Sequence, residues 1–223
     1  MNRFQMAEVL SHCADWLFGD IKRIKDEFIE LDAGLIDFLI ERREAGNWDI
    51  ALGARAETVE HEPTSAQAVD DSAVSLSAGA IRDLGNGYAL ALNFASAERV
   101  PVAEELFANG PHLASDAFEV GDPALGTETS RHIDIGIRKS GGSIGWSITG
   151  FVTDYDDFVF LRDTGDVDAE FGLPVFAFSQ QDAEFRGIET ELLTPIAEIG
   201  RGELDLRLFA DFVDAELANG DNV

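Results

Sequence analysis

The chain has 223 residues, of which 45% are hydrophobic and 26% are charged, so it can bury a core and is not disordered throughout. Its 43 acidic residues outnumber its 16 Lys and Arg residues, and the formal charge of -27 leaves no basic surface for nucleic acid. One cysteine, Cys13, excludes an internal disulfide and a cysteine-pair metal site. We therefore expect no nucleic-acid partner and no bound cofactor.

The first part of the chain predicts a helix. Apolar residues recur at steps of three and four from residue 4 to residue 31, which is typical of one amphipathic helix or of two helices broken at Gly19. The helix would either pack on the rest of the protein or form a short coiled coil. No stretch has the roughly 18 to 20 apolar residues of a membrane-spanning helix. Residues 1–8 also lack the features of a secretory signal.

Beyond Gly34 the apolar residues recur with a period of two, which indicates β-strands. In residues 131–139, for example, Ile133, Ile135 and Ile137 alternate with polar residues such as His132 and Asp134. We predict about eight strands in an antiparallel meander, with no crossover helix between them. The predicted strands are residues 35–43, 48–58, 73–84, 88–98, 131–140, 144–162, 173–193 and 203–217.

Short and long connections alternate strictly between these strands. The turns at 45–47, 85–87 and 141–143 and the stretch 195–202 are short and rich in turn residues. The links at 59–72, 99–130 and 163–172 are long and polar. This pattern is typical of a transmembrane β-barrel with short periplasmic turns and long external loops, and it predicts that the turns at 85–87 and 141–143 share one edge of the sheet.

A soluble β-sandwich also alternates apolar and polar residues, so three further features favour the barrel. The predicted strands are about ten residues or longer, as a tilted spanning strand requires. Trp48, Tyr88 and Trp146 stand just after short turns, where an interfacial aromatic girdle is found. The polar rows carry many charges, which suit a wet lumen better than the dry centre of a sandwich.

Several motifs occur in a consistent order along the chain. The run R-x-P-x-x-E-E-L contains Arg99, Pro101 and Leu106, and Gly121 and Glu128 follow in the segments F-E-V-G-D-P-A-L and E-T-S. A strand of the N-I-D-L-G type, the F-x-x-D-Y-D-D-F-V run at 151–159 and an R-G-I-E-T-E segment come next. That last segment contains Arg186, Gly187 and Glu189. Together these motifs resemble the barrel of TonB-dependent outer-membrane receptors.

The resemblance implies an all-β fold behind an N-terminal helix, with residues 35–223 forming part of a transmembrane barrel of 22 strands. Residues 1–34 do not resemble the family. The chain also lacks the family's signal peptide, TonB box, plug domain and closing aromatic strand, so we expect a fragment. The parent protein would lie in the outer membrane among lipid, couple to TonB through the plug that is absent here, and take up a scarce nutrient. That nutrient would be a metal ion, a ferric siderophore, haem or cobalamin.

The segment E-E-L-F-A-N-G-P-H-L-A, residues 104–114, most resembles the sequences of receptors associated with zinc uptake. His112 is the candidate metal ligand, with Glu104 and Glu105 beside it, and His132 is a further candidate contact for the ligand. A histidine in a Gly-Pro-His turn is, however, commonly a satisfied loop residue. The acidic residues Asp163, Asp166, Asp168 and Glu170 could hold calcium or simply form a solvated loop.

Two other functions stay open from the residues alone. A self-contained soluble β-sheet binding module would remain in solution without detergent, whereas a receptor fragment would aggregate or need detergent. The receptor fragment would also bind no zinc or siderophore with useful affinity. An enzyme is not expected, because the G-x-S-x-G match around Ser143 lacks the helix that a nucleophile elbow requires.

Overall fold

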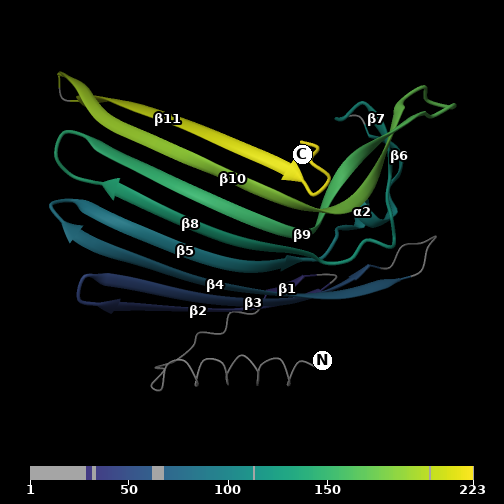
Figure 1. The fold of residues 1–223 in the computed structure, drawn as a ribbon, viewed down its shortest axis with the longest axis horizontal. Coiled ribbons are helices and arrows are strands. Elements are labelled where there is room, and N and C mark those ends of the chain that lie inside the picture. The colour runs from purple at the N-terminus through teal and green to yellow at the C-terminus, as the bar shows by residue number, and fades with distance from the viewer. Residues whose placement is uncertain (1–28, 32–33, 62–67, 113, 201, 223) are drawn as a thin grey trace.

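The computed structural model describes residues 29–31, 34–61, 68–112, 114–200 and 202–222, and these form one antiparallel sheet with a small set of loop elements (Figure 1). The eight long strands are β2 (Gly34–Ala45), β3 (Trp48–His61), β4 (Val69–Gly85), β5 (Tyr88–Arg99), β8 (Glu128–Lys139), β9 (Gly145–Val167), β10 (Pro174–Ile199) and β11 (Gly202–Leu217). The short elements are β1 (Ile29–Leu31), α2 (Ala103–Phe107), β6 (Asn109–His112) and β7 (Ala117–Val120).

The long strands follow one another as the predicted antiparallel meander. Each strand from β2 to β5, and then from β8 to β11, pairs with its neighbour in the chain, and β5 pairs with β8. The connection between β5 and β8 contains elements that the sequence pattern did not predict. In it, the β6–β7 hairpin places β7 parallel to the start of β10, with Val175 opposite Phe118. The link read as a long polar loop is therefore a folded segment that joins the sheet.

The tight turns lie at one edge of the sheet, called the turn edge here, and the long connections lie at the other, the loop edge (Figure 1). The backbone N–H of Ser140 donates to the carbonyl of Gly87 at 2.7 Å, so two of the predicted turns are side by side. Asn86, the middle residue of the 85–87 turn, has φ of 55°, the left-handed conformation that asparagine tolerates in tight turns. The predicted placement of the turns is confirmed.

Several strands are longer than the alternation predicted. The β9–β10 ladder continues to Val167 opposite Pro174, because backbone pairing persists in the acidic stretch that looked like a loop. At the other end β10 runs to Ile199 instead of stopping before Pro195. A register shift between Pro195 and Ala197 accommodates the proline, which has no N–H to donate to the ladder.

The predicted helix of residues 4–31 lies mostly outside the described residues. At its C-terminal end the prediction is wrong, because Ile29–Leu31 forms β1 and pairs with Gly34–Ile36 in an antiparallel ladder. The backbone hydrogen bonds of that ladder replace the helical ones. Among the described residues, no helix is long and apolar enough to cross a membrane.

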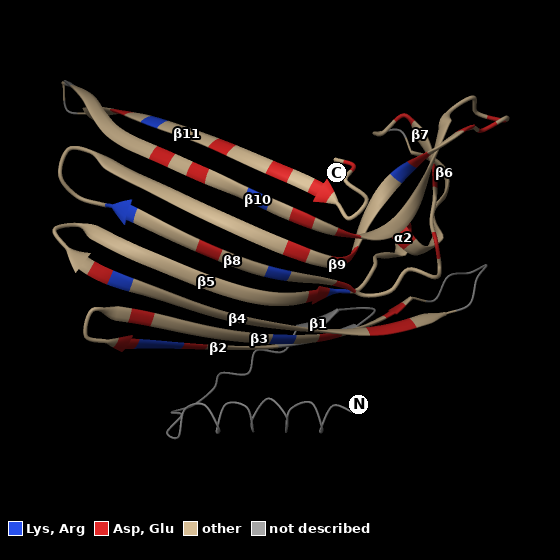
Figure 2. Ribbon diagram, viewed as in Figure 1, with Lys and Arg blue, Asp and Glu red and all other residues tan. Residues whose placement is uncertain are grey.

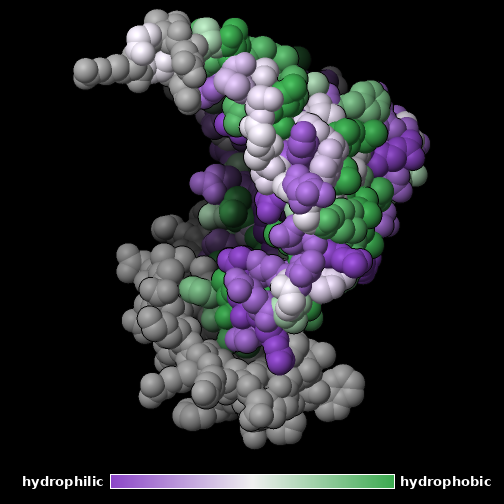
Figure 3. All heavy atoms as spheres, turned by 90° about the vertical axis from the view of Figure 1, so that its left-hand side faces the viewer, coloured by the Kyte–Doolittle hydropathy of each residue, from purple (hydrophilic) through white to green (hydrophobic). Residues whose placement is uncertain are grey.

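The sheet is curved, and its two faces differ in chemistry. The outer face carries the alternating rows of Ile, Leu, Val and Phe. Many of these side chains are exposed: Ile135 is 55% exposed and Phe212 is 71% exposed. The inner face carries Ser, Thr, Asn, Gly and charged residues and encloses a hollow spanned by β5, β8, β9, β10 and β11. Figure 3 looks onto the turn edge and shows the sheet as an arc around this hollow.

Fully buried apolar side chains gather at the loop edge. Leu106 of α2 is completely buried, and it packs with Leu125 and Val159. Phe107 and Phe178 flank this group. Among the described residues, the core therefore lies beneath the segment between β5 and β8, and the sheet itself buries little.

Candidate functional site

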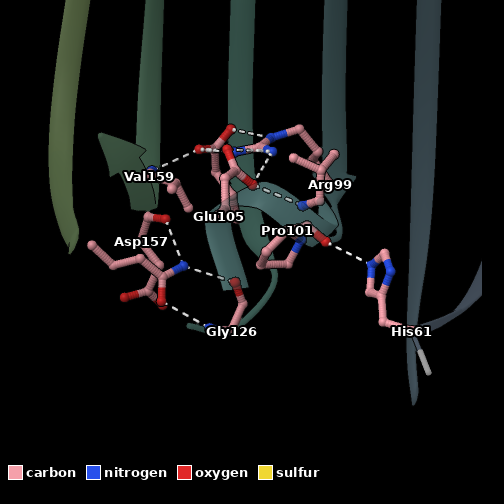
Figure 4. A network of polar contacts seen from close by, with 10 residues as sticks. His61, Arg99, Pro101, Glu105, Gly126, Asp157 and Val159 are labelled. Atoms are coloured by element: carbon pink, nitrogen blue, oxygen red, sulfur yellow. Dashed lines mark hydrogen bonds and ion pairs between the residues drawn. The ribbon is translucent and has the colours of Figure 1, made fainter. Parts of the chain in front are cut away.

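A network of ion pairs, called the loop-edge cluster here, fastens the segment between β5 and β8 to the sheet (Figure 4). Arg99, the last residue of β5, lies with Nη1 at 2.8 Å from Glu105 Oε2 and with Nη2 at 3.1 Å from Glu128 Oε2. Glu128 is only 7% exposed, and it also accepts the backbone N–H of Val159 at 2.8 Å. Glu105 accepts the N–H of Val102 at the start of α2. One guanidinium thus joins β5, α2 and β8, and through Glu128 it reaches β9.

The charge state of Arg99 follows from these contacts. Burial of the guanidinium lowers its pKa, but the hydrogen bonds with Glu128 and Glu105 raise it by more, so the pKa of Arg99 lies above its ordinary value. The side chain is therefore a permanent cation, balanced by two carboxylates. This arrangement suits a structural fastening more than proton transfer.

The motif residues that the sequence singled out around this segment come together in the cluster. Pro101 is buried, and its carbonyl oxygen is 3.1 Å from Nε2 of His61. Gly121 lies against α2 so closely that a Cβ on it would be 2.6 Å from the backbone carbon of Leu106. Only glycine fits there. Arg99, Pro101, Leu106, Gly121 and Glu128 thus form one packed unit.

His112 does not lie with Glu104 and Glu105 as the sequence suggested. It is on β6, where its Nδ1 is 3.0 Å from Glu119 Oε1 and 3.0 Å from Ser115 Oγ. Glu105 is turned toward Arg99, and Glu104 is exposed on α2. The sequence reading missed Glu119, because the β6–β7 pairing that brings it near His112 was not predicted.

No group of three or more His, Cys, Asp or Glu side chains in the described part of the chain is placed to hold a metal ion. This includes the acidic residues between β9 and β10. There Asp163 accepts the N–H of Gly165, and Asp168 accepts those of Glu170 and Phe171, so these carboxylates cap their own turns. Ser143 is followed by β9 and not by a helix, as the sequence indicated.

His132 lies on the inner face of β8, and both of its ring nitrogens have partners. Nδ1 is 2.8 Å from Thr153 Oγ1 and Nε2 is 3.2 Å from Asp134 Oδ2. Its ring stacks on Phe151 with 6.0 Å between the centroids. Asp134 also accepts a hydrogen bond from Asn93 on β5. These contacts hold a polar row at the wall of the hollow.

An aromatic group that the sequence reading missed lies on β9 and β10. The rings of Tyr155, Phe158 and Phe185 are 5.1 to 5.4 Å apart between centroids, in edge-to-face pairs. Asp157 has φ of 57°, and the register shifts beside it, so Tyr155 and Phe158 come together although three positions separate them. The two adjacent aspartates at 156 and 157 were the signal for this bulge.

The motif residues of β10 divide between the two faces. Arg186 pairs with Asp214 of β11 at 2.7 Å, while Glu189 lies opposite Thr149 on the other face. Gly187 leaves room for its neighbours, since a Cβ there would be 2.5 Å from the carbonyl oxygen of Phe212 and 2.8 Å from the Phe151 ring.

Figure 2 shows acidic residues spread over the strands and the loop edge, with few basic residues among them.

The family model described as TonB dependent receptor-like, beta-barrel matches residues 28–222. The chain belongs to this family. The resemblance seen in the motifs is thus confirmed at the level of the family, and membership favours the barrel over a self-contained soluble module.

Solved structures of similar fold include three receptors or transporters. The copper transporter OprC is 18% identical with a TM-score of 0.65, over 83% of this chain and 29% of that one. The FrpB iron transporter from Neisseria meningitidis (F3-3 variant) is 13% identical with a TM-score of 0.57, over 95% and 29%. The alcaligin outer membrane receptor FauA from Bordetella pertussis is 15% identical with a TM-score of 0.54, over 85% and 31%.

This chain is similar in fold to part of each of these structures. The chain spans 29 to 31% of the lengths of these three proteins.

Proposed function

We propose that this chain forms part of the wall of an outer-membrane receptor that takes up a scarce nutrient. The observation that carries the proposal is the contrast between the two faces: large apolar side chains of the outer face are open, whereas the inner face is polar and surrounds a hollow. Monomeric soluble proteins rarely leave such an apolar surface open, and lipid is the medium that covers it in a transmembrane barrel. In the complete receptor, TonB would act through a plug domain.

Flotation with lipid vesicles tests the proposal. We expect the purified 223-residue chain to need detergent, to float with vesicles once reconstituted, and to resist extraction from them by alkaline carbonate. A monodisperse monomer that unfolds cooperatively without detergent would contradict it and favour a soluble binding module.

We propose that the cargo meets the inner face near the aromatic group and His132. Tyr155, Phe158 and Phe185 give a stacking surface, and His132 with Asp134 adds polar contacts. Uptake by cells that make the receptor should fall when Tyr155→Ala and Phe185→Ala are combined. The matched control is Phe94→Ala on the outer face, which should leave uptake unchanged.

A metal ion or metal chelate is the proposed class of cargo, and zinc is its most specific form. The support for zinc is the sequence of residues 104–114. His112, which is exposed, and Glu119, which is buried, lie next to each other at the loop edge. Radioactive zinc and a labelled ferric siderophore should be compared in cells with and without the receptor gene. A loss of siderophore uptake with unchanged zinc uptake would reject the zinc proposal while leaving the receptor proposal intact.

A further inference from the structure

The outer face contains an apolar groove near the turn edge. Its floor is the small side chains of Ala78 and Ala80 on β4, and its volume is roughly 450 Å³. Its walls are Trp48 and Ile50 of β3 and Leu92 and Phe94 of β5. Because β3 and β5 are two strand spacings apart, about 9.5 Å, a single hydrocarbon chain fits between the walls.

Along β4 the groove has an apolar residue beyond one end and a cation beyond the other. Side chains at positions 76, 78, 80 and 82 share the outer face, since they alternate in the strand. Leu76, half exposed, stands beyond Ala78 on the side of the loop edge. At the turn edge Arg82 follows Ala80, and its guanidinium carbon is 5.3 Å from the centroid of the Trp48 ring. An aromatic platform thus orients the cation at the mouth of the groove.

Two further basic residues flank Arg82 on the same face. Arg43 of β2 lies opposite Ile50 of β3. Lys139 of β8 has its Nζ 5.8 Å from the centroid of the Tyr88 ring. Each is two strands away from β4, on opposite sides of it. These cations therefore form a row along the aromatic residues of the turn edge.

Five described basic residues make no ion pair: Arg138, Arg162 and the three cations of this row. Within the part of the chain that the structure describes, Arg43, Arg82 and Lys139 make no ion pair. Ion pairs do form at Arg42, Arg55, Arg99, Arg131, Arg186 and Arg207. In a chain with a charge of -27, three outer-face cations without acids point to an anion from outside the protein.

We propose that the groove binds an anionic glycerophospholipid of the leaflet at the turn edge, with one acyl chain between Trp48 and Phe94 and the phosphate at Arg82. The site matches an amphiphile, because its body is apolar and its mouth is cationic. An arginine stacked on an aromatic ring presents its N–H donors to phosphate oxygens. The inference rests on the proposed function, since it requires the outer face to lie in lipid.

Quenching of Trp48 fluorescence by brominated acyl chains tests the site. The chain with Trp16 and Trp146 replaced by Phe is reconstituted in phosphatidylcholine vesicles that contain brominated phosphatidylglycerol or brominated phosphatidylcholine at equal mole fraction. We expect the brominated phosphatidylglycerol to quench more. Arg82→Gln should lower this preference about fivefold, in line with about 1 kcal/mol for each basic residue at an anionic lipid surface.

The matched control is Arg138→Gln, which removes a basic residue from the inner face of the same turn edge and should leave the preference unchanged. Arg82→Lys should retain most of it, which shows that the loss in Arg82→Gln is a loss of charge. Equal quenching by both lipids, or equal effects of Arg82→Gln and Arg138→Gln, overturns the lipid site while flotation of the chain still supports the receptor proposal. Failure of the unmodified chain to float overturns both.

Discussion

The loop edge and the outer face differ in the burial of their apolar side chains and in the ion pairing of their charged ones. At the loop edge Leu106 is fully buried and Arg99 is held by two carboxylates of the same chain. On the outer face Ile135 is half exposed and Arg82 has an aromatic ring but no acid among the described residues. The first region is complete within the protein, whereas the second needs a medium that is apolar over the strands and anionic at the turn edge.

This difference predicts the largest effect for truncation of the apolar core at the loop edge. Leu106→Ala should lower the free energy of unfolding by about 2–5 kcal/mol, because it leaves a cavity in a fully packed position. Urea unfolding of the detergent-solubilised chain measures this. Leu92→Ala on the outer face is the control and should change stability by less than about 1.5 kcal/mol, since detergent fills the space. Equal losses would show that the two regions are packed alike.

Adjacent residues of β9 distinguish the two faces next. Ile148→Lys places a charge on the outer face, two residues from Trp146, and should destabilise the inserted state by up to about 4 kcal/mol, because a lysine on the lipid face costs most at the bilayer midplane and less toward the interfaces. Ser147→Lys, one residue away, faces the hollow and should cost little. Unfolding in vesicles measures both. A greater loss of stability for Ser147→Lys than for Ile148→Lys would show that lipid contacts the inner face, which contradicts the account.

Removal of the loop-edge cation should have a smaller effect. Arg99→Gln leaves the buried carboxylate of Glu128 without its cation, and we expect a loss of about 2–3 kcal/mol after allowance for the partial exposure of Arg99. Arg186→Gln, whose ion pair with Asp214 is open to solvent, is the control and should unfold at the same urea concentration as the unmodified chain. If both variants behave alike, the cluster does not fasten the segment.

The smallest predicted effect distinguishes two glycines of the sheet. Gly187→Ala forces a Cβ against Phe212 and Phe151 and should cost about 1–3 kcal/mol. Gly150→Ala, whose nearest contact would be 3.9 Å away, should change stability by less than about 1 kcal/mol. Thermal unfolding followed by circular dichroism compares the pair. A neutral Gly187→Ala would mean that the Phe151 ring moves aside freely.

The sequence predicted the regular part of the fold because that part follows one local rule. Alternation with a period of two located the eight long strands, and glycine-rich turns located the turn edge. The same rule does not apply to β6, β7 and α2, which are four or five residues long and too short to show a period. It also misplaced Ile29–Leu31, whose helical spacing yields to backbone pairing with β2.

The candidate site was predicted only where residues are close in the chain or belong to a motif. The motif indicated Arg99 and Glu128, although nothing local showed that they pair across 29 positions. The neighbour of His112 was misread, because Glu119 approaches it through a hairpin that alternation does not reveal. Nor does the sequence show that Arg82 has no acidic partner among the described residues, since that depends on which faces carry the carboxylates.

The orientation of the two faces is tested most directly by spin labels on adjacent positions of β8. Single cysteines at Ile135 and Asp134, in a chain with Cys13 replaced by Ser, would carry a nitroxide in reconstituted vesicles. The outer-face label at 135 should be relaxed mainly by oxygen, which concentrates in lipid, and the inner-face label at 134 mainly by a water-soluble nickel chelate. Equal accessibility of both labels to the nickel chelate would contradict a lipid-facing outer surface.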